Sequence, residues 1–223
     1  LAAKLGQPRI SVLEYGVAGG RGLLSLEYHA AEVEKLFPVK IDLYGFDTGK
    51  GLPSPKDYRD LPYHWREGFW RMEQDDLKTQ LKRSKLVLGP IEETAKTFFQ
   101  TYKPAPIGAI IHDFDFYSST AAGLEMLRAG HEHYLPRVFC YFDDTIGDEI
   151  ALYSDYTGQR LAIREFNEHD EPIKLSPVYY TYAKSYETWH RQIWVCHRFA
   201  HSQYGTFLSE ENQHLQSDPG PAR

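Results

Sequence analysis

Apolar runs of strand length alternate along this chain with amphipathic segments of helical period, and this alternation constrains the fold more than any other feature. The runs Ile10 to Tyr15 and Val39 to Phe46 are typical of buried strands. Between them, apolar residues recur at steps of three and four, namely Leu23, Leu26, Ala30, Val33 and Phe37. Strands that alternate with helices usually form a parallel sheet with helices on both faces, so the pattern predicts an α/β fold.

Further apolar runs continue the alternation and predict the third, fourth and fifth strands at Lys85 to Leu88, Ile107 to Ile111 and Val138 to Phe142. The C-terminal third differs in character. Ile173 to Tyr182 and Gln192 to Phe199 are rich in β-branched and aromatic residues, and a polar stretch separates them. Two such segments predict an antiparallel pair of strands.

The segments between these runs predict helices. Pro90 suits the first turn of a helix after the third strand. The helix after the fourth strand is expected to begin at a cap provided by Ser118, Ser119 or Thr120. Its apolar face would include Leu124, Leu127 and Leu135. A further helix is expected over Tyr153 to Phe166.

Length and composition fit a single domain that covers residues 1–223. The net charge of −6 disfavours a surface that binds nucleic acid, which needs clustered Lys and Arg. No apolar run reaches the ~20 residues that a membrane-spanning helix needs. With two cysteines there is no disulfide framework, so we expect a protein of the reducing cytoplasm. The chain could also form a homo-oligomer.

The connection at residues 49–84 is longer than an ordinary link between a strand and a helix. It carries five aromatic residues, Tyr58, Tyr63, Trp65, Phe69 and Trp70. The connection leaves the sheet where the second strand ends, so we expect a lid or a substrate-binding insertion. The alternative is a surface excursion that packs on its own aromatic cluster.

Four carboxylates follow two of the predicted strands. Asp113 and Asp115 follow the fourth strand, and being two positions apart in an extended segment they would face the same way. Asp143 and Asp144 follow the fifth strand. The carboxyl ends of parallel strands meet at one edge of an open sheet, where ligands bind, and so many anions there favour a bound cation. The alternative is that these residues cap helices and hold turns.

A glycine-rich turn follows the first strand, and glycines allow a ligand to approach the backbone closely. The spacing of Gly16 and Gly19 differs from the G-x-G-x-x-G pattern that cradles a pyrophosphate. Glu14 suits a cationic amine, and Asp47 lies where such folds place an acid that binds a ribose diol. A ligand with a ribose, an ammonium group and no pyrophosphate fits S-adenosylmethionine. A tight turn with helix-capping acids is the alternative interpretation.

Taken together, these motifs resemble the class I S-adenosylmethionine-dependent methyltransferases, and within them the macrocin O-methyltransferase family. The matching motifs are Leu13-Glu-Tyr-Gly-Val17, Tyr44-Gly-Phe-Asp-Thr48, Gly51-Leu-Pro53, Gly89-Pro-Ile-Glu-Glu-Thr94 and Asp113-Phe-Asp-Phe-Tyr-Ser-Ser-Thr120 with Asp143-Asp144. The resemblance covers nearly the whole chain. It implies a Rossmann-like, mostly parallel sheet of seven strands whose last pair is antiparallel.

The resemblance also implies roles for individual residues. The residues that would bind S-adenosylmethionine are Glu14, Tyr15, Gly16, Val17, Ala18, Gly19, Asp47, Gly89, Ile91 and Asp113. Asp113, Asp143 and Asp144 match the ligands of a divalent metal, usually magnesium. Asp115 matches the catalytic base.

The sequence thus predicts an enzyme that uses S-adenosylmethionine, with the assistance of magnesium, to methylate a hydroxyl of a sugar, glycoside or related natural product. Its partner would be a small-molecule hydroxyl acceptor. One alternative is magnesium-dependent phosphoryl transfer or hydrolysis, for which the chain lacks a phosphate loop. Another is a nucleoside-binding domain of the same fold that performs no chemistry.

Overall fold

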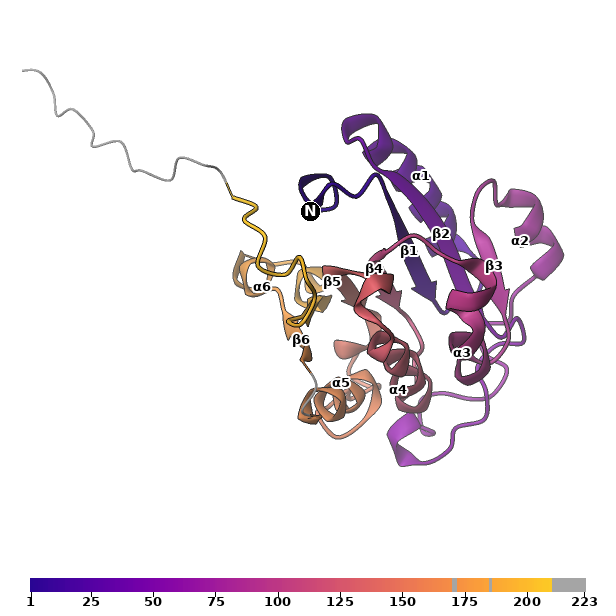
Figure 1. Cartoon of the computed structure of the whole chain (residues 1–223). Coiled ribbons are helices and arrows are strands. Elements are labelled where there is room, and N and C mark those ends of the chain that lie inside the picture. Colours follow the sequence, from indigo (N-terminus) through magenta and orange to yellow (C-terminus); the bar gives the residue numbers. More distant parts are fainter. Residues whose placement is uncertain (170–171, 185, 210–223) are drawn as a thin grey trace, which may run out of the picture.

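A seven-stranded sheet forms the centre of the protein (Figure 1), for which a computed structural model describes residues 1–169, 172–184 and 186–209. Its strands are β1 (Arg9–Tyr15), β2 (Lys40–Asp47), β3 (Lys85–Leu88), β4 (Ile107–His112), β5 (Tyr134–Phe142), β6 (Ile173–Pro177) and β7 (Ile193–Arg198). Their order is β3-β2-β1-β4-β5-β7-β6. The predicted extent of the domain includes residues 210–223, which lie outside the described residues.

The first five strands are parallel, and β7 runs antiparallel to both β5 and β6. This arrangement confirms the predicted mostly parallel sheet with an antiparallel C-terminal pair. The chain moves outward from β1 to β2 and β3, and then returns to build β4 and β5 on the other side of β1. The strand order therefore reverses between β1 and β4, and the carboxyl ends of these two strands border the crevice where ligands bind in such sheets.

Helices cover both faces of the sheet, as predicted. On one face, Leu23 of α1 (Arg21–Leu36) and Leu77 of α2 (Gln74–Gln80) pack with Leu43 of β2. The larger core on the other face joins β1, β2 and β5 to three helices, α3 (Ile91–Tyr102), α4 (Tyr117–Glu125) and α5 (Gly158–Glu168). Among the described helices, none combines the length and apolar character needed to cross a membrane.

The predicted place of Leu135 on a helix was wrong, because β5 begins four residues earlier than its apolar run indicates. Ile107 of β4 pairs with Tyr134, yet Ala109 pairs with Phe139, so β5 carries extra residues at an irregularity. A strand interrupted in this way loses its regular alternation, and the sequence pattern reveals only the part after the irregularity.

The helix predicted from Tyr153 begins only at Gly158, and the strand predicted to reach Tyr182 ends at Pro177. Val178 makes the last backbone bond to β7 at this edge of the sheet. Beyond it the chain turns into α6 (Tyr179–Lys184), in which local backbone bonds replace the missing strand partner. The aromatic residues of this segment have high β-propensity, yet the segment forms the helix α6.

Candidate active site

Two cavities meet in the crevice between the carboxyl ends of the strands. The larger, of about 400 Å³, is lined by six carboxylates and is called here the acidic cavity: Asp47, Asp113, Asp115, Asp143, Asp144 and Asp148. The smaller, of about 170 Å³, has a mostly apolar lining and is called here the apolar cavity. Its apolar residues include Phe46, Pro53, Pro90, Ile91 and Phe114. Gly16, Asp47 and Trp70 line both, so the two cavities share a boundary.

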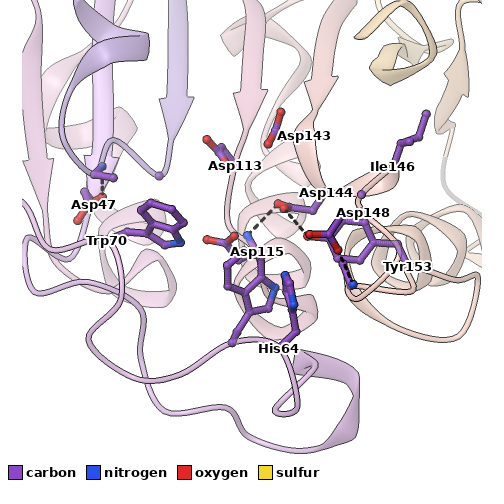
Figure 2. A pocket seen from close by; sticks show the side chains of 15 residues that line it. Asp47, His64, Trp70, Asp113, Asp115, Asp143, Asp144, Ile146, Asp148 and Tyr153 are labelled. Atoms are coloured by element: carbon purple, nitrogen blue, oxygen red, sulfur yellow. Dashed lines mark hydrogen bonds between the residues drawn. The ribbon is translucent and has the colours of Figure 1, made fainter. Parts of the chain in front are cut away.

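Three carboxylates come together at the centre of the acidic cavity. Ligand atoms of Asp113, Asp115 and Asp144 all lie within 4.8 Å of one another. Asp144 is held in place from two sides, because the Asp115 backbone N–H donates to Oδ2 at 2.9 Å and the Tyr153 hydroxyl donates to Oδ1 at 3.0 Å (Figure 2). Three oxygen ligands at this spacing form an arrangement that a divalent cation can bridge.

Asp143 lines the same cavity but has a different neighbour. Its Oδ1 accepts a hydrogen bond from the Tyr141 hydroxyl at 3.0 Å. The sequence grouped Asp143 with Asp113 and Asp144 as metal ligands, whereas the described residues bring Asp115 into the closest group. The predicted set of metal ligands stays a prediction.

Asp113 and Asp115 face one cavity for a reason other than the expected one. An extended strand end would place residues two apart on one side, but β4 ends at His112 and Asp115 has a left-handed backbone with φ +59°. The premise of an extended segment was therefore wrong. The turn at Asp115 points its backbone N–H at Asp144, and the carboxylate still lines the acidic cavity.

Burial and mutual repulsion disfavour the ionised forms of these acids. Loss of solvation, followed by the charges of the neighbouring aspartates, raises the pKa of Asp113 to about 8. Burial, followed by the charges of neighbouring aspartates, also raises the pKa of Asp115 and the pKa of Asp144. A bound cation would reverse the effect by favouring the ionised forms.

This electrostatic arrangement predicts how stability depends on pH when no metal is bound. The folded-state pKa of Asp113, about 8, exceeds the ordinary value of 3.8, so the folded protein binds the proton more tightly than the unfolded chain. The stabilisation is complete below the ordinary pKa and is lost as pH rises towards 8. Differential scanning calorimetry of metal-free protein should show a thermal midpoint that falls between about pH 4 and pH 8, and magnesium should restore it at pH 8. Asp113→Asn is the matched control, and an equally steep fall in that variant would contradict the assignment.

The glycine-rich turn after β1 is held against Asp113 and Asp47. Gly16 has φ +83°, and a Cβ there would lie 1.7 Å from the backbone oxygen of Asp113. Asp47 Oδ2 accepts hydrogen bonds from the backbone N–H groups of Val17 and Ala18, both at 2.9 Å. Its Oδ1 accepts from Gly49. Asp47 therefore organises the turn, in addition to lining both cavities.

Of the other predicted cofactor residues, some line a cavity and the rest do not. Gly89 and Ile91 line the apolar cavity, and Ala18 lines the acidic one. The side chains of Tyr15 and Val17 instead pack in the core, where the Tyr15 ring stacks on Phe114. Gly19 and Glu14 line neither cavity. A ligand could therefore contact Tyr15, Val17 and Gly19 only through their backbone.

Glu14 is a buried acid without a complete set of partners. Its side chain is 5% exposed, and its Oε2 has no hydrogen-bond partner among the described residues. Burial, followed by the charge of Asp47, raises the pKa of Glu14 to about 8. A buried carboxylate oxygen that lacks a donor fits an ammonium group, and the aspartate cluster fits a hard divalent cation. The residues present thus fit both S-adenosylmethionine and magnesium.

The insertion at residues 49–84 contributes residues to the linings of both cavities. His64, Trp65 and Trp70 line the acidic cavity, and Gly51, Pro53 and Lys56 line the apolar one. The Tyr63 hydroxyl donates to the backbone oxygen of Ala151 at 2.7 Å, which joins the insertion to the loop after β5. These contacts place the insertion over the site. Its role as a lid stays a prediction.

Asp60 anchors the insertion to the core. Its side chain is fully buried and accepts hydrogen bonds from the Ser118 backbone N–H at 2.8 Å, the Ser118 hydroxyl at 2.9 Å and the Lys56 backbone N–H at 2.8 Å. The predicted capping of α4 by its own first residues was wrong, because the cap position is Phe116 and no local side chain bonds there. Asp60 of the insertion takes that place.

Sequence reasoning missed several residues of the site. Tyr153 was expected on a helix, yet it lies in a loop and binds Asp144. Gln159 holds two strand ends together, since its amide oxygen accepts from the Asp144 N–H and its amide N–H₂ donates to the His112 oxygen. Asp60 carried no local signal because it bonds to Ser118, which is distant in sequence, and His64 carried none because only the fold of the insertion brings it to the cavity.

Solved structures share this architecture. CalS11, described as calicheamicin methyltransferase, superposes with a TM-score of 0.57 at 24% identity, over 75% of this chain and 68% of that chain. The O-methyltransferase NovP superposes with a TM-score of 0.54 at 15% identity, over 84% of this chain and 71% of that chain. No protein-family model and no curated protein matches the chain. Identities this low establish the fold alone, and the chain therefore has the Rossmann-like fold of the class I methyltransferases.

Proposed function

We propose that the protein is an S-adenosylmethionine-dependent, magnesium-assisted O-methyltransferase that acts on a hydroxyl of a sugar, glycoside or related natural product. The observation that carries the proposal is the shared boundary of the two cavities, where Gly16 and Asp47 face the carboxylate cluster. A methyl donor in the apolar cavity and a hydroxyl in the acidic cavity would meet there. CalS11 is described as a calicheamicin methyltransferase and NovP as an O-methyltransferase, and these descriptions favour methyl transfer as the reaction.

The chain offers separate residues for each ligand. Asp47, Gly89 and Ile91 line the apolar cavity and would hold the donor there. Glu14 lies outside the lining of both cavities, so its contact with the ammonium group stays a prediction. Asp113, Asp143 and Asp144 would hold magnesium. Asp143 still has one carboxylate oxygen without a described partner, because only its Oδ1 binds Tyr141.

S-adenosylmethionine supplies the transferable methyl group when bound, and magnesium supplies positive charge that makes an acceptor hydroxyl more acidic. With both groups bound, Asp115 would accept the proton of the acceptor hydroxyl as that oxygen receives the methyl group. Tyr153 and the Asp115 N–H fix the orientation of Asp144. His64, Trp65 and Trp70 cover the reacting groups and restrict access of water.

Calorimetry with S-adenosylmethionine, with and without magnesium, separates the proposed function from its alternatives. We expect donor binding without metal and turnover only with metal, because the cation serves the acceptor. Asp144→Asn should abolish magnesium-dependent turnover and change donor affinity by less than about threefold. Turnover is followed as S-adenosylhomocysteine formed in a screen of glycosides and phenols.

The other outcomes have clear meanings. Full activity in chelator-treated protein would refute the metal mechanism. Donor binding without turnover on any acceptor would favour a nucleoside-binding domain. Magnesium-dependent hydrolysis of phosphate esters without donor binding would favour the phosphoryl-transfer alternative. If magnesium binding survives Asp143→Asn but not Asp115→Asn, then Asp115 is the third metal ligand.

A further inference from the structure

Trp70 occupies the boundary between the two cavities. It lines both of them, together with Gly16 and Asp47. In Figure 2 its ring lies between the side chains of Asp47 and Asp115. The carboxylate of Asp47 already accepts three backbone hydrogen bonds, and Gly16 has no side chain. Trp70 is therefore the largest side chain that a ligand spanning this boundary meets.

The backbone holds Trp70 in an unfavourable conformation. Its φ is +60°, in the left-handed region that bulky residues avoid. The preceding segment is paired with Leu52, whose N–H donates to the Phe69 oxygen and whose oxygen accepts from the Gly68 N–H, each at 2.8 Å. Two residues later, Met72 is buried in the core. Such a conformation persists only where the surroundings impose it, and it is common at functional sites.

Packing against the protein does not explain the position of the ring. The residue is 57% exposed, and its described ring contact is with Trp65 at a centroid distance of 6.4 Å. The chain thus fixes a large aromatic side chain over the cavities instead of burying it. An aromatic face in this position can bind a cation, and tryptophan gives the strongest such interaction.

We propose that Trp70 binds the sulfonium group of S-adenosylmethionine through its indole face and thereby positions the transferable methyl group. This inference rests on the proposed function, since a donor in the apolar cavity and an acceptor in the acidic cavity place the sulfonium at their shared boundary. The product S-adenosylhomocysteine carries a neutral thioether in place of the sulfonium. Trp70 therefore favours the donor over the product, which assists exchange after each turnover.

The test compares the affinities of the two ligands, which differ by one methyl group and one positive charge. Isothermal titration calorimetry of Trp70→Leu should show affinity for S-adenosylmethionine about tenfold weaker, and affinity for S-adenosylhomocysteine changed by less than about threefold. Trp70→Phe should recover part of the difference. Phe69→Leu is the matched control, because Phe69 is the adjacent aromatic residue of the insertion and lines neither cavity, and its ratio of affinities should equal that of the wild type.

A second variant protects the experiment against misfolding. Trp70→Gly removes the ring and also suits the left-handed backbone, so it should fold and show the same selective loss. Equal weakening of both ligands in Trp70→Leu and Trp70→Gly, or no weakening of either, would overturn the assignment while the proposed function stands. A wild-type protein that binds neither ligand would overturn the proposed function and this assignment with it.

Discussion

Asp115→Asn is expected to lower turnover by roughly 10²- to 10⁴-fold, the range for removal of a positioned general base. The carboxylate lines the acidic cavity beside Asp113 and Asp144, and asparagine keeps its size and its backbone bond to Asp144. Asparagine cannot accept the acceptor's proton at neutral pH. Binding of S-adenosylmethionine should therefore be nearly unchanged, and single-turnover kinetics should locate the loss in the chemical step.

Asp148→Asn is the matched control for this prediction. Asp148 lines the same cavity, but it is exposed and its Oδ1 accepts backbone bonds from Ile150 and Ala151. We expect it to retain most of the turnover. If Asp115→Asn lowers the thermal midpoint but leaves the rate intact, Asp115 is a structural residue and another carboxylate is the base. Capping of α4 would not account for such a result, because Asp60 performs it.

Gly16→Ala should destabilise the protein by roughly 2–6 kcal/mol, which combines a strained left-handed backbone with overpacking. The added Cβ would lie 1.7 Å from the Asp113 oxygen, and backbone cannot move aside as a flexible side chain can. To relieve this clash, the backbone after β1 would have to move away from the backbone of Asp113. Chemical denaturation should report the loss of stability, and calorimetry a loss of donor affinity in any protein that still folds.

Gly19→Ala tests whether the effect of Gly16→Ala is specific to its position. Gly19 lies in the same turn, but nothing comes within 4 Å of its added Cβ and its φ is not in the left-handed region. Its stability should stay within about 0.5 kcal/mol of the wild type. Similar losses in both variants would mean that the turn as a whole, rather than the approach of Gly16 to Asp113, resists substitution.

Local patterns predicted the parallel part of the sheet well. The bounds of β3 match the predicted run, those of β1 and β4 differ by one residue at one end, and those of β2 differ by one residue at each end. Buried parallel strands are continuous apolar runs, so their own residues identify them. Errors arose where the structure depends on distant partners. The irregularity of β5 concealed its beginning, and the segment predicted to continue β6 forms α6, where local backbone bonds take the place of strand pairing.

In the site, too, features set by local sequence could be predicted and features set by distant partners could not. Asp113, Asp115, Asp143 and Asp144 could be located from the sequence, because each lies in the segment just after a strand and the edge of a parallel sheet collects such residues. Which three carboxylates lie closest together depends on the backbone turn at Asp115 and on the hydroxyl of Tyr141. A pattern of residue types does not record such side-chain contacts.

The contact between Asp60 and Ser118 has a consequence for protein engineering. Insertions over an active site are obvious segments to exchange between related scaffolds when a new acceptor is wanted. Here the segment to be exchanged also supplies the cap of α4, a core helix. A graft that lacks an acid at this place would lose about 1 kcal/mol of stability whatever acceptor it was chosen for. Chimaeras should therefore keep Asp60, and the recognition of new acceptors should be varied in the residues that follow it.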